Sequence, residues 1–460
     1  MSVGPIHDAP AAAAWLEGLI DVEKSPDLPY ARLGLEPIRR LLARLGDPQR
    51  GLRVIHIAGS KGKGSTALFA ESLLRAAGVR VGTFTSPHLE RWTERFRIDG
   101  AEVPGPDLAA AVRCLRPEVE ALRAQDPSRA PTFFDATTAA ALWLFREAQV
   151  DRVVLEVGLG GRLDSTNVVE PAVACITTIE LEHTDKLGDT LEQIAGEKAG
   201  ILKPGVPVVG GALPEPARRV VEARARALGA PLAWLGEDFR CEILAADASG
   251  LSLELRDGPL AVEARIPVLG AHQAANAALA LACVRRAGIS DAVLAAAAPR
   301  GFAAVRLPGR AELLSRAPWI LVDGAHTANS ARALARVLAG LPRRRMHLVL
   351  SISADKDLGA ILDALLPAAN EVTVTRAEPK RSQDPAAIAA AIRRAAPELA
   401  LRVVPNPHLA LRAAAEALAP EDLLCATGSI YLAGIARSVL APGPEPAALG
   451  SGSGSRGSLP

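Results

Sequence analysis

A loop rich in glycine and lysine is the segment of this chain whose residue types point most directly to chemistry. Residues 59–66 read GSKGKGST, follow the apolar run Val54–Ala58, and lead into a helical pattern. Glycines let a backbone turn tightly, so that successive N–H groups face one phosphate, and a helix start adds partial positive charge. Lys63 adds a full positive charge. The segment therefore predicts a binding loop for a nucleoside triphosphate, and ATP is the first expectation.

The loop departs from the common phosphate-binding pattern, in which Gly-Lys is followed directly by Ser or Thr. Gly64 stands at that position, and the glycine before Gly62 lies only three residues upstream. An oxygen ligand for magnesium must then come from Ser65, Thr66 or a more distant residue. The alternative is a glycine-rich turn that caps a helix and carries two lysines for solubility.

Three ionisable residues in the next part of the chain follow predicted strands or helices. Glu156 ends an apolar strand and precedes a glycine-rich turn, where ligands bind in open α/β sheets. It could hold a magnesium ion or its water, or be an exposed strand end. His183 could be a metal ligand, a phosphate contact or a structural histidine. Lys198 could turn toward a metal centre or simply favour a helix C-terminus.

A similar group occurs in the second half of the chain. Asp323 follows a predicted strand and precedes a glycine and His326, and the segment LPGR with Arg310 comes shortly before it. Arg310 could contact nucleotide phosphates, and Asp323 could bind ribose hydroxyls. The alternative for Arg310 is a Pro-Gly turn that needs no ligand.

Composition limits the classes of protein to consider. The 460 residues predict two or three domains, and 49% hydrophobic with 22% charged residues is typical of soluble globular proteins. The net charge of +1 gives no electrostatic case for a nucleic-acid or membrane partner. The 5 cysteines form no CxxC pair, which argues against a disulfide framework or zinc site and favours a reducing cytoplasm. The N-terminus lacks the features of a signal peptide.

Strand-like runs alternate with helical patterns from residue 50 to about 230, and again from about 300. Continuous Val and Ile runs predict strands buried on both faces of a mostly parallel sheet. We therefore expect an α/β fold: a P-loop-containing, doubly wound sheet in residues 1–298 and a second Rossmann-like α/β domain in residues 299–440. Residues 232–267 predict a small antiparallel β element. Residues 441–460 are of low complexity and predict a disordered tail.

Taken in order, these segments resemble the folylpolyglutamate synthase/dihydrofolate synthase family of the Mur ligase group. The resemblance extends from about Trp15 to Leu440. The loop is common to Mur-type ligases, whereas TSPHL joined to LEVGLGGRLDSTN is typical of folate ligases. The resemblance implies an N-terminal Mur-ligase-type ATP-binding domain and a C-terminal glutamate-ligase domain. It is carried by HIAGSKGKGST, TSPHL, LEVGLGGRLDSTN, HTDKLGDTLEQIAGEKAGILK, LGAHQAANA, LPGR, DGAH and TGSIYL.

The resemblance also implies a role for each matching residue. The magnesium ligands correspond to Ser86, Glu156 and His183. Lys198 corresponds to a lysine that is carbamylated and helps to hold a second divalent or monovalent cation. Lys63, His183 and Lys198 form the implied catalytic group. The nucleotide contacts correspond to Gly59, Ser60, Lys61, Gly62, Lys63, Gly64, Ser65, Asn276, Arg310, Asp323 and His326.

The implied reaction is the ATP- and Mg²⁺-dependent ligation of L-glutamate to a pterin acid, with release of ADP and phosphate. The acid would be dihydropteroate, or tetrahydrofolate and its polyglutamates, and it would be activated as an acyl phosphate. Known relatives make a monomer the expected state. Two alternatives remain: a Mur-type amide ligase that acts on a non-folate acid, and a nucleotide-dependent switch or binding module without ligase activity.

Three departures from the family pattern bear on substrate choice. Ser60 and Lys61 replace the Thr and Asn of the bacterial GTNGKGS, and Thr327-Ala328 replaces Asn-Pro after DGAH. Both changes are closer to the eukaryotic type. Asp135 replaces the usual Glu after Phe134. The ATP and metal residues are unaffected, but which pterin is used, and whether one or two reactions are catalysed, stays open.

Overall fold

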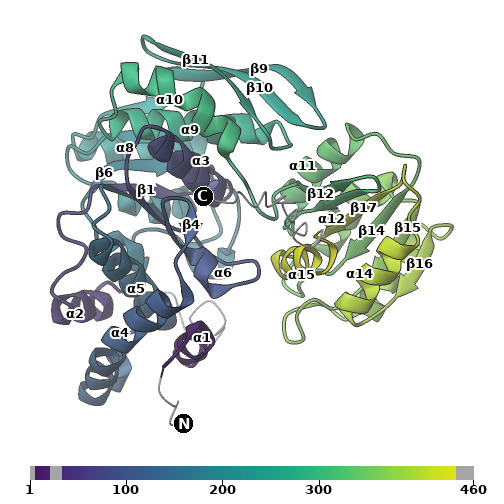
Figure 1. The fold of residues 1–460 in the computed structure, drawn as a ribbon, viewed down its shortest axis with the longest axis horizontal. Helices are drawn as coiled ribbons and strands as arrows, with labels where there is room; N and C mark the ends of the chain where they lie inside the picture. Colours follow the sequence, from purple (N-terminus) through teal and green to yellow (C-terminus); the bar gives the residue numbers. More distant parts are fainter. Residues whose placement is uncertain (1–5, 21–33, 442–460) are drawn as a thin grey trace, which may run out of the picture. The chain divides into compact units, whose positions relative to one another are not determined.

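The computed structural model describes residues 6–20 and 34–441, which form two compact units, Met1–Pro308 and Gly309–Pro460 (Figure 1). The helix Asp291–Ala304 runs through the predicted boundary after residue 298 and packs within the first unit. The functional limits of 1–298 and 299–440 stay predictions. Of the predicted disordered tail, residues 442–460 lie outside the described part. No helix in the described ranges combines the length and apolarity needed to cross a bilayer.

The first unit is built on an eight-stranded sheet with the order β4-β3-β2-β5-β1-β6-β7-β8. The six neighbouring strands β2, β5, β1, β6, β7 and β8 are parallel. At one edge, β3 pairs antiparallel with β2, and β4 pairs antiparallel with β3. The predicted mostly parallel sheet is therefore confirmed. The strands are β1 (Val54–Ala58), β2 (Val81–Phe84), β3 (Phe96–Ile98), β4 (Ala101–Glu102), β5 (Arg152–Glu156), β6 (Pro171–Ile176), β7 (Val208–Gly210) and β8 (Leu232–Trp234).

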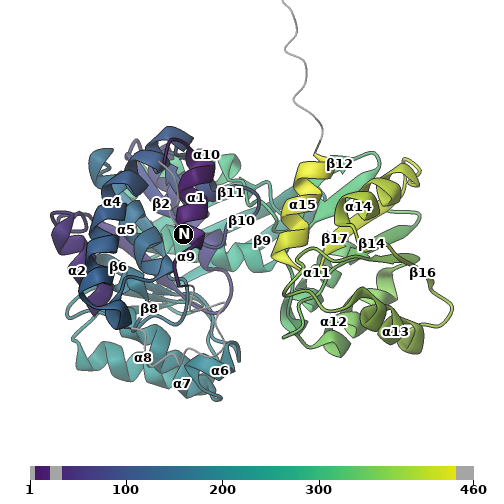
Figure 2. The same cartoon turned by 90° about the horizontal axis from the view of Figure 1, so that it is seen from below.

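Helices cover both faces of this sheet because its strands are apolar on both sides. In β1, Ile55 and Ile57 join one core with α3 and α9, while Val54 joins another with α4 and α5. Figure 2 shows α4 and α5 side by side, with α7 and α8 in another part of the unit. The helices are α1 (Ala9–Glu17), α2 (Glu36–Arg44), α3 (Lys63–Ala76), α4 (Gly105–Gln125), α5 (Phe133–Glu147), α6 (Thr184–Leu187), α7 (Leu191–Lys198), α8 (Glu215–Ala227), α9 (His272–Arg286) and α10 (Asp291–Ala304).

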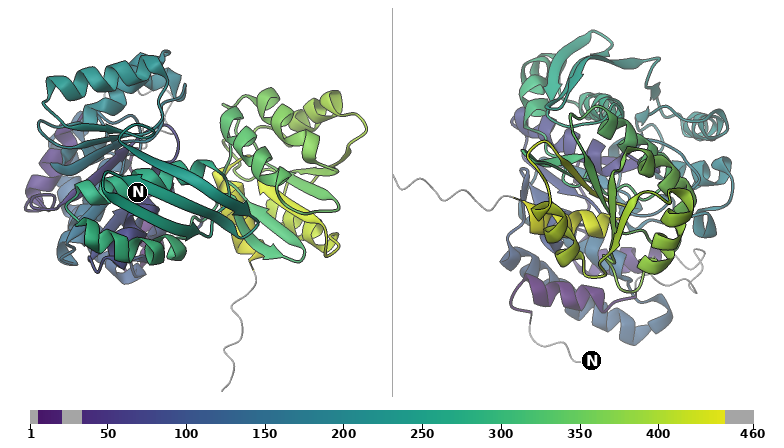
Figure 3. Two further views of the ribbon diagram at one scale, coloured as in Figure 1. Left: turned by 90° about the horizontal axis from the view of Figure 1, so that it is seen from above. Right: turned by 90° about the vertical axis from the view of Figure 1, so that its right-hand side faces the viewer.

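The predicted antiparallel element is present between Phe239 and Ile266 as three strands in the order β11-β10-β9. Its predicted start at residue 232 was wrong, because β8 pairs parallel with β7 in the eight-stranded sheet. The three strands are β9 (Phe239–Asp247), β10 (Gly250–Asp257) and β11 (Leu260–Ile266), drawn in teal in Figure 3. Alternate leucines of β10 pack into the core shared with α9. The buried carboxylate of Asp257 pairs with Arg285 and Arg286 of α9, which fixes the sheet to that helix.

The second unit has a six-stranded sheet with the order β12-β13-β17-β14-β15-β16. All neighbours are parallel except β12, which pairs antiparallel with β13 at the edge. The second α/β domain is confirmed as a fold. Its elements are β12 (Glu312–Arg316), β13 (Trp319–Val322), α11 (Ala328–Ala339), β14 (Met346–Leu350), α12 (Leu358–Leu365), β15 (Glu371–Val374), α13 (Pro385–Ala395), β16 (Ala400–Val403), α14 (Pro407–Glu416), β17 (Leu423–Thr427) and α15 (Ile430–Leu440).

The topology of the first unit determines which loops meet. Strands β2, β5, β1 and β6 are consecutive neighbours and all parallel. The segments that follow them therefore leave the sheet at one edge, the carboxyl edge, where open α/β sheets bind ligands. The segments after β2, β1 and β6 carry Ser86, the glycine-rich loop and Thr177, and Glu156 is the last residue of β5 at the same edge.

Candidate active site

The glycine-rich loop joins the end of β1 to the first turn of α3. Gly62 has a φ of 85°, in the left-handed region, and serves as the N-cap of α3. A Cβ at this position would also overlap the side-chain oxygen of Asn276, so the loop needs glycine here for two reasons. The first amides of α3 have no acceptor within the helix and can bind an anion.

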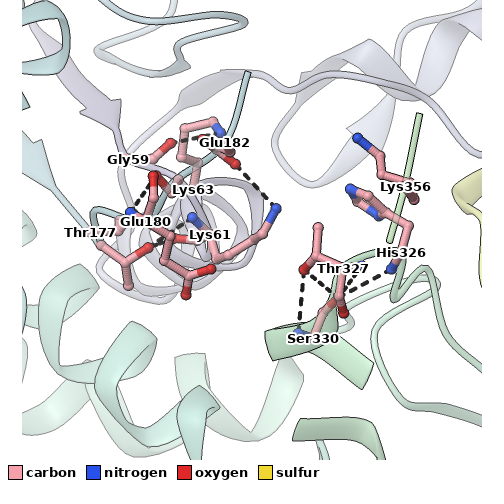
Figure 4. Close-up of polar contacts among 12 residues, drawn as sticks. Gly59, Lys61, Lys63, Thr177, Glu180, Glu182, His326, Thr327, Ser330 and Lys356 are labelled. Atoms are coloured by element: carbon pink, nitrogen blue, oxygen red, sulfur yellow. Dashed lines mark hydrogen bonds and ion pairs between the residues drawn. The ribbon is translucent and has the colours of Figure 1, made fainter. Parts of the chain in front are cut away.

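Two lysines from distant parts of the chain share one carbonyl of this loop. Lys63 Nζ donates to the carbonyl oxygen of Gly59 at 2.9 Å, as Figure 4 shows. Lys198 Nζ donates to the same oxygen at 3.0 Å. The structure thus brings together Lys63 and Lys198, two of the predicted catalytic residues. Both amines lie at Gly59, the first residue of the loop.

Glu182 completes this cluster and was not among the predicted site residues. Its two carboxylate oxygens lie 3.1 Å from Lys198 Nζ and 3.2 Å from Lys61 Nζ. Burial alone would raise the pKa of Glu182, but the charges of Lys198, Lys63 and Lys61 outweigh it and lower the pKa to about 2. Glu182 is therefore ionised. No local pattern marks Glu182, because its partner Lys61 lies 121 residues away in the chain.

Lys198 is buried, with 2% of its side chain exposed. Burial disfavours the ammonium form and lowers the pKa of Lys198 to about 8, although Glu182 acts in the opposite direction. A lysine with this pKa has a substantial fraction of neutral amine near pH 8. Neutral amine is the form that reacts as a nucleophile.

Glu156 lies between the loop after β2 and the first turn of α3. Its Oε2 accepts a hydrogen bond from the backbone N–H of Ser86 at 3.0 Å. A Cβ on Gly64 would lie 3.3 Å from the same oxygen. The glycine that replaces the usual hydroxyl residue therefore leaves room for a carboxylate. Glu156 and Ser86 offer oxygen atoms, the ligands that Mg²⁺ prefers, so the residues fit such an ion.

His183 lies on a different segment, after β6. It has a φ of 47°, occupies the N-cap position of the short helix α6, and follows Glu182 directly. Its side chain is exposed. Within the described residues, no three His, Cys, Asp or Glu side chains converge as a metal site. The structure joins Ser86 to Glu156, whereas the place of His183 in the predicted trio of ligands stays a prediction.

Asn276 reaches the loop from α9. Its Oδ1 lies beside Gly62 and 3.5 Å from the hydroxyl of Thr66, and its Nδ2 donates to Gln273 Oε1 at 2.8 Å. Asn276 is therefore at the loop, where a nucleotide contact was predicted. The buried hydrogen bond to Gln273 fixes the orientation of its amide.

In the second unit, the three predicted residues lie together at the end of β13. Asp323 accepts hydrogen bonds from the N–H groups of Ala311 and Ala325, both at 2.6 Å, and so ties LPGR to DGAH. Burial raises the pKa of Asp323. His326 Nδ1 lies 2.7 Å from the Gly324 carbonyl, so this nitrogen carries the proton. Arg310 donates to Gly309 at 3.1 Å.

Two of the departures from the family pattern have structural partners here. Thr327 is the N-cap of α11 and forms a capping box with Ser330, as Figure 4 shows. Asp135 closes the capping box of α5 and accepts a hydrogen bond from the Ser165 hydroxyl at 2.7 Å. Burial raises the pKa of Asp135. Both residues therefore stabilise helix starts.

Comparison with known proteins identifies the family. The model of the Mur ligase middle domain matches residues 57–284, and that of the Mur ligase glutamate ligase domain matches residues 309–430. A dihydrofolate synthase/folylpolyglutamate synthase of Mycobacterium tuberculosis is 35% identical, over 94% of this chain and 95% of that protein. The chain belongs to the folylpolyglutamate synthase/dihydrofolate synthase family.

Some members of the family are longer. The chain spans about half the length of two relatives named probable bifunctional folylpolyglutamate synthase/dihydropteroate synthase. The one from Haloferax volcanii is 36% identical over 88% of this chain and 48% of that protein. The one from Halobacterium salinarum is 37% identical over 88% of this chain and 49% of that protein.

Solved structures of folylpolyglutamate synthases have the same fold. The Mycobacterium tuberculosis enzyme complexed with ADP and AMPPCP superposes with a TM-score of 0.84 at 34% identity, over 95% of this chain and 100% of that chain. Escherichia coli FolC in complex with DHPP and ADP gives a TM-score of 0.79 at 31% identity, over 93% and 97%. The expected fold class is confirmed for both units.

Proposed function

We propose that this member of the family is an ATP-dependent ligase that joins L-glutamate to a pterin acid. The acid is dihydropteroate, or tetrahydrofolate and its polyglutamates. The observation that carries the proposal is the placement of Lys63, Glu156 and Ser86 at one sheet edge, around a loop suited to phosphate. Relatives aligned over most of the chain carry ADP, AMPPCP or DHPP in their structures, which supports the same ligand classes here.

The chemistry follows from the substrates. A carboxylate and an amine do not condense in water without activation. The γ-phosphoryl group of ATP is transferred to a carboxylate oxygen of the pterin acid, which gives an acyl phosphate and ADP. The amino group of L-glutamate then attacks the acyl carbon, the bond to phosphate breaks, and the amide forms with loss of a proton. Phosphoryl transfer depends mainly on positioning and on neutralisation of charge.

The first unit supplies most of the groups for this work. Lys63 exchanges the Gly59 carbonyl for the β- and γ-phosphates, and the amides of the loop from Gly62 onward donate to phosphate oxygens. Asn276 contacts the nucleotide from α9. For the second unit, we propose that Arg310 and His326 contact phosphate oxygens and that Asp323 binds the ribose. The remaining proposed nucleotide contacts are Ser60, Lys61, Gly64 and Ser65.

We assign Glu156, Ser86 and His183 to a magnesium ion. The fit is best for Glu156, because its carboxylate faces the first turn of α3 across Gly64. When bound, the ion neutralises negative charge on the phosphates. The backbone N–H of Ser86 holds the carboxylate in place, so the chain orients this ligand before the ion enters.

We further propose that Lys198 is carbamylated. The neutral amine adds to CO₂, a proton is lost, and a buried cation becomes an anion that could help to hold a second cation. The lowered pKa of Lys198, about 8, supports the reaction because it supplies neutral amine. The intact mass of the wild-type protein should exceed that of Lys198→Arg by one CO₂, beyond the residue difference, in bicarbonate buffer. Equal corrected masses would contradict the assignment.

The function is tested with purified protein, ATP, Mg²⁺ and L-glutamate. ADP release should require dihydropteroate, tetrahydrofolate or both, and comparison of the two acids shows which reaction is catalysed. Release only with a non-folate acid would replace the pterin by another substrate. Nucleotide binding without turnover on any acid would contradict ligase activity altogether.

Compartment and oligomeric state are part of the proposal. All five cysteines are free thiols and three of them are buried, which is typical of proteins kept in a reducing environment. We therefore propose that the enzyme acts in the cytoplasm, and as a monomer. Light scattering of the purified protein measures the oligomeric state directly, and a mass of two or more chains would refute the monomer.

A further inference from the structure

Two threonines after β6 hold the backbone of the glycine-rich loop. Thr177 Oγ1 donates to the Lys61 carbonyl at 2.6 Å, a bond visible in Figure 4. Thr178 Oγ1 accepts from the Lys61 N–H at 2.8 Å and lies 3.2 Å from the Lys61 carbonyl, to which it can also donate. Both polar groups of the Lys61 backbone are therefore satisfied by hydroxyls from the segment that follows β6.

The neighbouring residue is held by the same segment. The backbone N–H of Ser60 donates to the carbonyl of Thr178 at 2.8 Å. The Ser60 hydroxyl accepts from the N–H of Glu180 at 2.9 Å. Ser60 and Lys61 thus form a short clasp with residues 177–180, although the two segments are more than a hundred residues apart in the chain.

Within this clasp, Thr177 is held firmly in place by its surroundings. This residue is 1% exposed, and its N–H donates to the Ala58 carbonyl at 2.9 Å, which continues the pairing of β6 with β1. A Cβ at Gly59 would overlap the hydroxyl of Thr177, and a Cβ at Gly211 would overlap its carbonyl oxygen. Thr177 is therefore enclosed from both sides, and its hydroxyl has little freedom to leave Lys61.

The charges around the loop explain why uncharged hydroxyl groups are suited to holding its backbone. The amines of Lys61, Lys63 and Lys198 all lie close to Glu182, and each lowers the pKa of that carboxyl. Before any carbamylation of Lys198, the three protonated amines repel one another, and Glu182 offsets only part of their charge. Ion pairs of the side chains also rearrange when phosphate enters, whereas hydrogen bonds of a hydroxyl to the backbone need not change.

We propose that Thr177 and Thr178 are positioning residues of the nucleotide-binding loop. The clasp fixes the peptide groups of Ser60 and Lys61, so that the amides from Gly62 onward face the phosphates before the nucleotide arrives. Without the Thr178 hydroxyl, the loop samples other orientations and part of the binding free energy is used to order it. The inference rests on the proposed function only in taking this loop as the nucleotide site.

The test compares Thr178→Val and Thr178→Ser in the full-length protein. Valine keeps the shape but removes the hydroxyl, whereas serine keeps the hydroxyl. Thr83→Val is the matched control, because the hydroxyl of Thr83 is buried in β2 and makes no hydrogen bond among the described residues. The measurements are the Kd for ADP by calorimetry, KM for ATP, kcat, and the thermal unfolding midpoint without nucleotide.

Thr178→Val should weaken ADP binding by about tenfold and raise KM for ATP in proportion, as expected for lost hydrogen bonds in a binding site. At saturating ATP, kcat should stay within about twofold of wild type, since positioning is restored once the site is full. Thr178→Ser and Thr83→Val should bind ADP like wild type. If Thr178→Val binds like wild type, or Thr178→Ser binds as weakly as Thr178→Val, the inference is wrong.

Two further outcomes are informative. If Thr178→Val does not fold, Thr178→Ala and Thr178→Ser are compared by the rise in unfolding midpoint that ADP produces, and equal rises would refute the inference. If wild-type protein binds ADP but shows no pterin-dependent turnover, the proposed ligase function fails. The effect of Thr178 on ADP affinity would then still decide the role of the clasp.

Discussion

One cluster of charged side chains at the loop is built from three segments of the chain. It consists of Lys61, Lys63, Lys198 and Glu182. Before any carbamylation of Lys198, the protonated amines leave the cluster with a positive excess, since the charge of Glu182, whose pKa these lysines lower, offsets only part of theirs. A positive excess beside helix amides is suited to a triphosphate. The Gly59 carbonyl accepts from two of the amines and keeps them close to each other until a stronger acceptor arrives.

Lys63→Ala tests the most direct consequence of this arrangement. We expect turnover to fall at least a hundredfold, as for other groups that stabilise charge in a transition state, while the free energy of unfolding changes little. The reason is that Lys63 is partly exposed and that its hydrogen bond to the Gly59 carbonyl lies in a loop, outside the core. Lys380→Ala, at an exposed lysine of the second unit, is the control. Near-normal activity of Lys63→Ala would remove Lys63 from its assigned role.

Glu156→Gln tests the magnesium assignment. Glutamine keeps the size of the side chain and an acceptor for the Ser86 N–H, but it removes the negative charge that attracts the cation. The Mg²⁺ concentration for half-maximal turnover should therefore rise about tenfold or more, while KM for L-glutamate stays the same. Superimposable Mg²⁺ titrations of the two proteins would show that Glu156 is not a ligand.

His56 gives a prediction for the dependence of stability on pH. It is buried in β1, its Nε2 lies 2.8 Å from the Thr166 hydroxyl, and burial, with the nearby Lys203 charge, lowers its pKa to about 3. Between this value and the ordinary 6.5, the unfolded chain binds a proton that the folded protein does not. Stability should therefore fall as pH drops through this window, by up to about 1.4 kcal/mol per pH unit.

The measurement is the free energy of unfolding in urea between pH 7 and pH 4, for wild type, His56→Gln and His408→Gln. His56→Gln should show a shallower fall with acidification than wild type, although it is less stable at pH 7. His408 is exposed on α14, so its variant should follow the wild-type slope. Equal slopes for His56→Gln and wild type would mean that His56 does not cause the acid sensitivity.

At the scale of single elements, the two ends of α3 allow a matched comparison. Gly62 before the helix and Gly78 after it both have positive φ, 85° and 78°. A Cβ at Gly78 meets nothing within 4 Å, whereas at Gly62 it overlaps Asn276. Gly78→Ala should cost about 1 kcal/mol of stability through backbone strain alone.

Gly62→Ala should cost more, because the strain is joined by displacement of Asn276 from the loop. It should also weaken ADP binding, whereas Gly78→Ala should not. Urea unfolding and ADP titration of both variants measure the two effects. If the two substitutions have the same effect on ADP affinity, contact between Gly62 and Asn276 has no bearing on the nucleotide site.

Elements with strong sequence patterns were predictable, and short or interrupted ones were not. The apolar run of β1, the strand that ends at Glu156 and the antiparallel strands β9, β10 and β11 were predicted correctly. The edge strands β3, β4 and β12 were missed, because strands this short or this exposed carry little periodicity. In α10, Pro299 lies inside the helix, and the predicted domain boundary was placed beside it. Tertiary packing on α3 keeps the helix continuous at this point.

Some residues of the candidate site were likewise predictable from local sequence patterns, and others were not. The loop, Glu156 and Lys198 stand in motifs, so their region could be predicted from the order of residues. Glu182, Thr177 and Thr178 act through partners far away in the chain, and no local pattern marks them. Their roles depend on β6 lying next to β1 in the sheet, which is a property of topology and not of spacing.

At the scale of the whole molecule, both units use the same construction. Each has a mainly parallel sheet with an antiparallel edge, and each gathers its candidate residues where strands end. Each also has a core of its own. The division of labour proposed here is that the first unit supplies most of the groups that hold the triphosphate, and that the contacts proposed for Arg310, Asp323 and His326 of the second unit are needed for turnover. Such a division can be tested without separating the units.

His326→Ala in the full chain makes this test. The ring is oriented by the Gly324 carbonyl at one nitrogen, and its loop is closed by Asp323 and by the cap of α11, so alanine should leave the fold intact. We expect kcat at saturating substrates to fall about ten- to hundredfold, the usual effect of losing a hydrogen bond to a charged group. ADP affinity should change by about twofold or less, because most of the groups proposed to hold the phosphates of ADP, namely the loop amides and Lys63, remain in place. His408→Ala, on an exposed face of the same unit, should match wild type in both measurements. Wild-type kcat in His326→Ala would exclude this histidine from the reaction, and a parallel loss of ADP affinity would mean that His326 holds the bound nucleotide as well as the reacting γ-phosphoryl group.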